Sequence, residues 1–163
     1  MDKSVQKLSL YLETSVWNFV FADDAPEKRD ATKLLFKEIR EGKFEIYISD
    51  LVAGEIGNTK GPKRDHLEKL IQGYAPIQLL EDDKVKELSN AYTKAKFAPE
   101  KAAADLTHVA YTVAHKLDVI VSWNLKHIVR LKTKLAVNGI NKLLGYREIE
   151  IVTPEEALSY GSL

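Results

Sequence analysis

The chain has 163 residues, of which 45% are hydrophobic and 29% are charged, and its 24 basic and 24 acidic side chains leave no formal net charge. This length favours one domain, because each of two cores would be too small to bury enough apolar surface. The chain has no cysteine, which excludes disulfides, thiolate metal sites and cysteine nucleophiles.

The balanced charge also limits the kind of nucleic-acid binding to expect. Proteins that coat nucleic acids are usually basic, because neutralising phosphates supplies most of their affinity. If this chain acts on a nucleic acid, it must do so through a local patch and a metal ion. Its first 19 residues lack the apolar core and cleavage site of a signal peptide, and no stretch approaches the roughly 20 apolar residues of a membrane span. We therefore expect a soluble, cytoplasmic protein with no membrane partner.

Short apolar or β-branched runs alternate with longer segments of helical periodicity. The predicted strands are Leu8–Leu12, Phe44–Ile48, Ile77–Leu80, Val119–Val121 and Glu148–Val152. The predicted helices are Pro26–Arg40, Leu51–Asn58, Lys63–Gln72, Asp82–Lys96 and Glu100–Lys116, with a short C-terminal helix at 154–160. Strands that alternate with helices indicate βαβ units. The expected fold class is α/β, a three-layer α/β/α domain with a mostly parallel central sheet of four to five strands.

Three acids stand in unusual local contexts along this predicted order. Glu13 follows the first strand directly, Glu55 is the only charge in the segment LVAGEIG after the second strand, and Asp105 lies in the first turns of the helix before the fourth strand. Ligands of open parallel sheets bind beyond the carboxyl ends of the strands, where these acids should converge. Clustered carboxylates repel one another and need a hard divalent cation or an unusual protonation state. With no cysteine and few histidines, Mg²⁺ or Mn²⁺ is the natural ion.

Each acid taken alone also has an ordinary structural interpretation. Glu13 could be a helix N-terminal acid beside the capping candidates Thr14 and Ser15. Glu55 could face solvent on an amphipathic helix. Asp105 could simply be favoured near the positive end of its helix. The sequence supports these alternatives about as well as a metal-binding role for any one acid, and only the joint placement of the three favours a metal site.

The segments YLETSVWN, ISDLVAGEI and DLTHVAYTVAHKLDVIVSWNLKHI resemble, in this order, the signature of PIN-domain proteins, especially the VapC-like toxin ribonuclease group. In that signature an acid closes the first strand, a Glu lies in the helix after the second strand, an Asp opens a later helix, and a strand ends in Ser/Thr-x-Asn. The resemblance spans roughly residues 8–152. It implies a single PIN-like domain over residues 1–163 that acts as a metal-dependent endoribonuclease, the toxin of a toxin–antitoxin pair.

The same resemblance implies roles for individual residues. Glu13, Glu55 and Asp105 would be the catalytic acids that bind Mg²⁺ or Mn²⁺. Ser15 falls where a hydroxyl supports metal-bound waters, and Asn124 where a polar side chain contacts the substrate or a metal-binding residue. The expected partners are an RNA substrate, an antitoxin protein and a second copy of the chain in a homodimer.

Two residues depart from the signature. The first acid is Glu13 where Asp is usual, and its longer side chain bears on metal preference. His127 occupies the position about three residues after Asn124 where a fourth acid is expected, and imidazole favours Mn²⁺ over Mg²⁺. These departures leave open a catalytically weak or inactive PIN-like module that binds RNA or a protein partner. A phosphatase or similar enzyme is less well supported, because the chain has no glycine-rich phosphate loop.

Histidines and tryptophans near the predicted site have two interpretations each. His108, one helical turn after the third acid, could contact substrate or a metal-binding residue, but we favour a partly buried histidine bonded to a backbone carbonyl. Trp17 and Trp123 could stack on unpaired bases, but core or dimer packing is favoured for both. His66 and His115 are interpreted as surface residues.

The densest basic stretch lies after the fourth predicted strand and consists of Lys126, His127, Arg130, Lys132 and Lys134. It could contact a phosphate backbone or form an ordinary solvated helix face, and the sequence favours neither.

Overall fold

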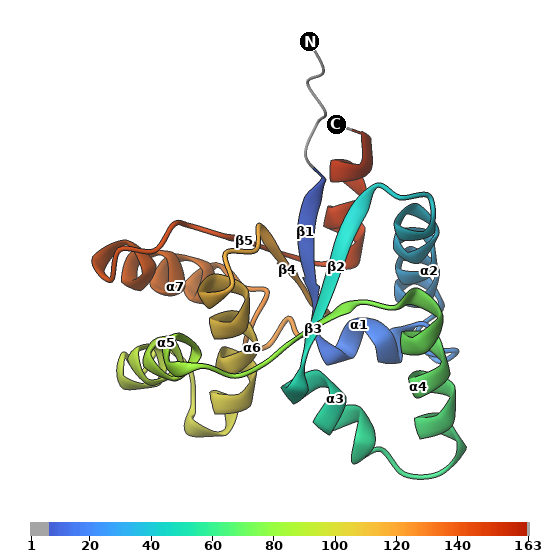
Figure 1. Cartoon of the computed structure of the whole chain (residues 1–163), viewed down its shortest axis with the longest axis horizontal. Coiled ribbons are helices and arrows are strands. Elements are labelled where there is room, and N and C mark those ends of the chain that lie inside the picture. The colour runs from blue at the N-terminus through green and yellow to red at the C-terminus, as the bar shows by residue number, and fades with distance from the viewer. Residues whose placement is uncertain (1–6, 163) are drawn as a thin grey trace.

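The computed structural model describes residues 7–162 and shows one five-stranded sheet with helices on both faces (Figure 1). All strand pairs are parallel, in the order β3-β2-β1-β4-β5. The strands are β1 (Leu8–Leu12), β2 (Phe44–Ser49), β3 (Ile77–Leu79), β4 (Val119–Val121) and β5 (Glu150–Val152). The expected fold class, a three-layer α/β/α domain with a central sheet of four to five strands, is confirmed. Residues 1–6 and 163 of the expected domain lie outside the described residues.

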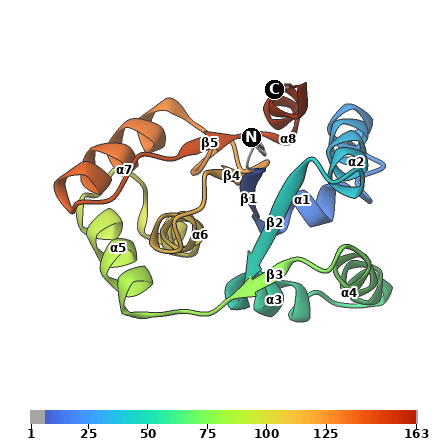
Figure 2. The ribbon, with the colours of Figure 1, turned by 45° about the horizontal axis from the view of Figure 1, so that its top comes forward.

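The helices form two layers, which Figure 2 shows on opposite sides of the sheet. One layer contains α2 (Pro26–Arg40), α4 (Pro62–Tyr74) and α8 (Pro154–Ala157), and the other contains α5 (Asp83–Lys94), α6 (Ala103–Ala114) and α7 (Leu131–Leu143). Two shorter helices, α1 (Thr14–Phe19) and α3 (Asp50–Gly57), begin just after β1 and β2, and two 3-10 helices are η1 (Glu100–Ala102) and η2 (Leu158–Ser162). None of the helices described is long and apolar enough to cross a membrane.

Two helices were not predicted from the sequence. The short α1 has only six residues, too few to give a clear helical period. The sequence of α7, LKTKLAVNGINKL, contains threonine, valine, isoleucine, asparagine and glycine, all poor helix formers. Packing stabilises α7 instead, because Thr133, Val137 and Asn141 lie one turn apart and are fully buried.

The order of the strands changes direction beside β1, the central strand. From β1 the chain builds outward to β2 and β3, then returns to place β4 and β5 on the opposite side. In sheets of this type the crevice at such a reversal is the usual ligand site. Leu10, Tyr11 and Leu12 of β1 are fully buried, so the strand is covered by helices on both faces.

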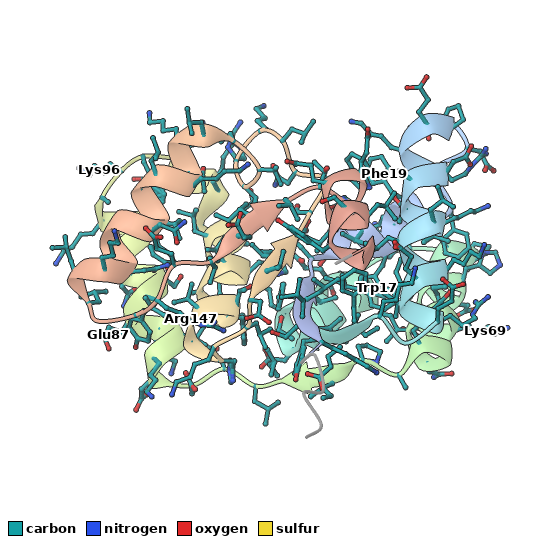
Figure 3. The ribbon with its side chains drawn as sticks, turned by 90° about the horizontal axis from the view of Figure 1, so that it is seen from above. Trp17, Phe19, Lys69, Glu87, Lys96 and Arg147 are labelled. Atoms are coloured by element: carbon teal, nitrogen blue, oxygen red, sulfur yellow. The ribbon has the colours of Figure 1, made fainter. Side chains whose placement is uncertain are left out.

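Both tryptophans belong to the interior, which confirms the core interpretation. Trp17 is fully buried, packs against Phe36 of α2 with ring centroids 5.0 Å apart, and lies on the α2 side of the molecule (Figure 3). Trp123 is 8% exposed, and its indole N–H donates to the Thr32 hydroxyl at 2.8 Å. Neither indole is therefore free to stack on a base.

Candidate metal centre

The carboxyl edge of the sheet, at the reversal between β1 and β4, gathers polar side chains from four elements. Glu13 follows β1, Ser122 follows β4, Glu55 projects from α3, and Asp105 and His108 come from α6. The backbone N–H of Glu13 donates to the carbonyl of the last residue of β4 at 3.1 Å, which continues the strand pairing into the site. The convergence expected for parallel strands therefore brings these residues to one place.

Glu13 is 6% exposed and is held by hydrogen bonds on both carboxylate oxygens. Its Oε1 accepts from the hydroxyls of Ser15 and Ser122, each at 2.6 Å. Its Oε2 accepts from the backbone N–H of Ser15 at 3.2 Å, so Glu13 also caps α1. Glu13 therefore both caps α1 and belongs to the carboxylate cluster.

The two serine hydroxyls are oriented by backbone donors. Ser15 Oγ accepts from the N–H of Trp123 at 2.8 Å, and Ser122 Oγ accepts from the N–H of Asn124 at 2.9 Å. Because an N–H group can only donate, each hydroxyl is left to donate its own hydrogen to Glu13. Ser122 is not among the site residues predicted from the sequence. Its place directly after β4, in the quoted Ser-x-Asn pattern, was the available signal.

Glu55 contacts the cluster through one carboxylate oxygen, although its side chain remains 35% exposed to solvent. Its Oε1 accepts from the Thr14 hydroxyl at 2.5 Å and lies 2.8 Å from Nε2 of His108. Burial acts to raise the pKa of Glu55, but the hydrogen bonds and charge of His108, with the Thr14 hydroxyl, outweigh it and lower the pKa. The group therefore favours the charged carboxylate that a cation needs.

Asp105 borders the cluster and is half-buried. Burial is the largest cause that raises its pKa, and the negative charge of Glu13 adds to the rise. The Asn124 side chain, His127 and His108 act in the opposite direction without cancelling it. A raised pKa means that the fold disfavours this negative charge, and a cation would relieve that cost.

Three residues come within metal-binding reach of one another: one ligand atom from each of Glu13, Glu55 and His108 lies within 4.8 Å of the others. The structure thus brings together two of the three predicted metal-binding acids, while Asp105 is not a member of this group. Glu55 Oε2 makes no hydrogen bond with any group in residues 7–162. The carboxylates fit a divalent cation that prefers oxygen ligands, such as Mg²⁺ or Mn²⁺.

His108 differs from its favoured interpretation. It is fully buried, and its partners are side chains rather than a backbone carbonyl. Nδ1 lies 2.7 Å from the Tyr11 hydroxyl and Nε2 lies 2.8 Å from Glu55. Tyr11 lies in a strand buried on both faces, where no alternation of polar and apolar residues could reveal a polar role.

Asn124 and His127 shape the loop after β4. Asn124 Oδ1 accepts from the backbone N–H of His127 at 2.9 Å, so the amide also stabilises a turn. Nδ1 of His127 is buried and has no hydrogen-bond partner among residues 7–162. In the basic stretch, Lys126 and Lys132 are exposed, but Arg130 donates to the carbonyl of Phe97 at 2.7 Å and serves the fold.

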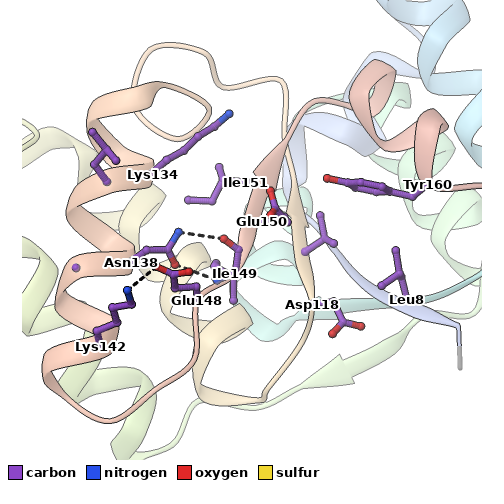
Figure 4. A pocket seen from close by; sticks show the side chains of 13 residues that line it. Leu8, Asp118, Lys134, Asn138, Lys142, Glu148, Ile149, Glu150, Ile151 and Tyr160 are labelled. Carbon is purple, nitrogen blue, oxygen red and sulfur yellow. Dashed lines mark hydrogen bonds and ion pairs between the residues drawn. The ribbon is translucent and has the colours of Figure 1, made fainter. Parts of the chain in front are cut away.

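A cavity of about 670 Å³ lies away from these carboxylates, near the amino ends of β1, β4 and β5 (Figure 4). It is bordered by α7 and by Tyr160 of η2. Lys134 of the basic stretch lines it, but none of the predicted catalytic or metal-binding acids does, so the cavity and the carboxylate cluster are separate features of the fold.

Fold and site together define a parallel α/β domain with a cluster of oriented carboxylates at its topological reversal. No family model and no curated protein matches the chain. Among solved structures it is similar to the one titled "Crystal structure of VapBC2 from Rickettsia felis bound to a DNA fragment from their promoter". That similarity covers 90% of this chain and 98% of the other, at 14% identity and a TM-score of 0.49. At these values it does not determine function, which must be inferred from the side chains.

Proposed function

We propose that this chain is a metal-dependent endoribonuclease that hydrolyses RNA phosphodiester bonds. The observation that carries the proposal is the pair of oriented carboxylates, Glu13 and Glu55, with ligand atoms within 4.8 Å of each other at the reversal of the sheet. The resemblance of YLETSVWN, ISDLVAGEI and the Asp105 segment to PIN-domain ribonucleases supports RNA as the substrate.

In this proposal Glu13, Glu55 and Asp105 hold Mg²⁺ or Mn²⁺. The bound ion would activate water and neutralise charge as the phosphodiester bond breaks. Glu13 is kept in place by Ser15 and Ser122, so its carboxylate needs no rearrangement to bind. The raised pKa of Asp105 makes it the acid that gains most from a cation nearby.

Asn124 and His127 border the same site and are proposed to contact the RNA. His127 has an unpaired, buried Nδ1 among the described residues, and both side chains influence the pKa of Asp105. The exposed Lys126 and Lys132 lie on the adjoining loop and helix, where they are suited to contact phosphates. By the same resemblance we propose a cytoplasmic toxin that forms a homodimer and is restrained by an antitoxin protein.

The decisive test is RNA cleavage by the variant Asp105→Asn. Wild-type protein should cleave RNA with Mg²⁺ or Mn²⁺ and stop when EDTA is added. Asp105→Asn should lower the cleavage rate by about 100-fold or more, a loss typical of removing one charge-stabilising group. The melting temperature should stay unchanged or rise, because the fold disfavours the Asp105 charge.

A matched control is Glu87→Gln, which removes an exposed acid from α5, outside the cluster, and should cleave at the wild-type rate. Full activity in Asp105→Asn would overturn the assignment of this acid.

A second candidate, a binding module without catalysis, is favoured by one observation: His127 stands where the PIN signature has a fourth acid. Titration calorimetry with Mg²⁺ and Mn²⁺ separates the two candidates. A nuclease should show a metal site of about millimolar affinity or tighter, whereas the binding module should show none.

A further inference from the structure

A buried chain of hydrogen bonds leads from α3 through β1 to the site. The Val52 N–H donates to Ser49 Oγ at 3.2 Å, and Ser49 Oγ lies 2.7 Å from the Tyr11 hydroxyl. The Tyr11 hydroxyl lies 2.7 Å from Nδ1 of His108, whose Nε2 lies 2.8 Å from Oε1 of Glu55. Ser49, Tyr11 and His108 are all fully buried, so none of them is in contact with bulk solvent.

The contact between His108 and Glu55 has two chemical explanations. Nε2 could carry a hydrogen and donate it to Glu55, since 2.8 Å is an ordinary hydrogen-bond length. Alternatively, Nε2 could offer a lone pair to a cation that Glu55 also binds, because neighbouring ligands of one ion lie about 3 Å apart. The distance alone does not distinguish the two.

The count of donors along the chain does distinguish them. The Val52 N–H can only donate, so Ser49 Oγ is its acceptor. If Ser49 donates to Tyr11 and Tyr11 donates to Nδ1, then Nε2 carries the ring hydrogen and donates to Glu55. Every donor in this arrangement has an acceptor.

The reversed direction of donation leaves one donor, the Ser49 hydroxyl, without an acceptor. If Nδ1 donates to Tyr11 and Tyr11 donates to Ser49, the Ser49 hydrogen has no acceptor left among residues 7–162, because the other contact of Ser49 Oγ is with a donor. An unpaired buried donor is costly to a fold.

We propose that His108 is a hydrogen-bond donor to Glu55 rather than a cation ligand, and that Tyr11 is the positioning residue that imposes this role through Nδ1. The inference rests on the proposed function in one respect, that Glu55 binds the cation. Glu55 then presents Oε2, which has no hydrogen bond within the described residues. The resulting ligand set is all oxygen, which suits Mg²⁺ and Mn²⁺ rather than ions that prefer imidazole.

Nitrogen NMR of the histidine rings tests the inference directly. Long-range proton–nitrogen spectra of the full chain would be recorded at about pH 8, above the ordinary histidine pKa of about 6.5. The His108 signals would be assigned by their loss in His108→Gln. We expect hydrogen on Nε2 and none on Nδ1, both without Mg²⁺ and at saturating Mg²⁺. Hydrogen on Nδ1 in either state would overturn the proposal.

The variant Tyr11→Phe tests the positioning role. It keeps the ring, which stacks on Tyr111 with centroids 6.4 Å apart, and removes only the hydroxyl. We expect a mixture of His108 tautomers and a Mg²⁺ affinity lower by about 10- to 100-fold, as when other partners of metal-binding residues are lost. An unchanged spectrum with unchanged affinity would contradict the role of Tyr11.

The matched control is Tyr92→Phe, which also loses a fully buried hydroxyl, in this case one bonded to Asn141 at 2.5 Å between α5 and α7. It should leave the tautomer and the Mg²⁺ affinity unchanged. If Tyr11→Phe does not fold, the wild-type spectra still show which ring nitrogen of His108 carries the hydrogen, and so whether His108 donates to Glu55.

Failure of this inference is distinguishable from failure of the proposed function. A chain that neither binds Mg²⁺ nor cleaves RNA, yet shows the Nε2–H tautomer and loses it in Tyr11→Phe, would retain the role of Tyr11 and refute the nuclease. A chain that cleaves RNA with hydrogen on Nδ1 of His108 would retain the nuclease and refute the role of Tyr11.

Discussion

At the level of single residues, the two carboxylates of the cluster are held in the same way. Oε1 of Glu13 accepts hydrogen bonds from two serine hydroxyls. Oε1 of Glu55 accepts from the Thr14 hydroxyl and lies within hydrogen-bond distance of Nε2 of His108. Oε2 of Glu13 accepts from one backbone N–H, and Oε2 of Glu55 has no hydrogen bond among residues 7–162. The saturated oxygen fixes the orientation of each carboxylate, and the other oxygen remains available to a ligand.

Removal of a saturating donor should therefore weaken metal binding without removing a charge. We expect Ser122→Ala to lower Mn²⁺ affinity by about 10-fold, because Glu13 loses one of its two hydroxyl donors. Stability should also fall by about 1–3 kcal/mol, because the N–H of Asn124 loses its acceptor. Titration calorimetry and urea denaturation measure the two effects.

Ser89→Ala provides the comparison for this prediction. Its hydroxyl bonds to Thr107 at 2.8 Å, between α5 and α6 and outside the carboxylate cluster. Ser89→Ala should affect stability only. Equal Mn²⁺ affinity in Ser122→Ala and wild type would show that Ser122 does not orient Glu13.

The sequence predicted the acids of this site better than the groups that hold them. Glu13 and Glu55 were recognised because an isolated charge in an apolar segment is visible in one dimension. The bond between Ser122 and Glu13 joins residues 109 positions apart, and the bond between Tyr11 and His108 joins residues 97 apart. Such pairings depend on strand register, which local residue patterns do not specify.

At the level of elements, another carboxylate joins β1 to β4 at the amino ends of the strands, the edge of the sheet opposite to the site. Asp118, just before β4, accepts from the N–H and the hydroxyl of Ser9 in β1, both at 2.9 Å, and from Arg147 at 3.0 Å. Burial acts to raise the pKa of Asp118, but these hydrogen bonds outweigh it and lower the pKa. Asp118 thus fastens the amino ends of the two strands whose carboxyl ends form the site.

Because the folded-state pKa of Asp118 is depressed, its stabilisation is present above its unfolded pKa of about 3.9 and is lost as pH falls through the folded value. We expect Asp118→Asn to lower the free energy of unfolding by about 1–2 kcal/mol at neutral pH. The difference from wild type should shrink below about pH 4. Denaturant titrations at neutral and acid pH measure both, and a deficit independent of pH would contradict the explanation.

The strands and the longer helices followed from periodicity. Their predicted bounds differ from the structure by one or two residues at an end in β2, β3, β5, α3, α4 and α5. Helix α7 was not predicted, because Thr, Val, Asn, Gly and Ile interrupt its stronger helix formers and its buried stripe becomes recognisable only against α5. The expected helix Glu100–Lys116 begins as the 3-10 helix η1 and ends as an α-helix at Ala114.

For the whole molecule, a cation that binds the folded site alone must stabilise the fold. At a free Mn²⁺ concentration of about 100 times the dissociation constant, we expect the free energy of unfolding to rise by about 2.7 kcal/mol. Glu55→Gln should abolish most of this rise, because it removes one carboxylate of the cluster. Thermal melts with Mn²⁺ and with EDTA measure the effect, and a melting temperature unaffected by Mn²⁺ would exclude a site of useful affinity.

The pairing of β1 with β4 also has a consequence for when activity can appear. Glu13 leaves the ribosome early, but its partner Ser122 is made 109 residues later and reaches it only after β4 has joined the sheet. Contacts this distant in sequence form slowly compared with local ones. A nascent or partly folded chain therefore carries Glu13 and Glu55 without a formed centre, which by the proposed function would delay RNA cleavage until β4 has been made and has joined β1.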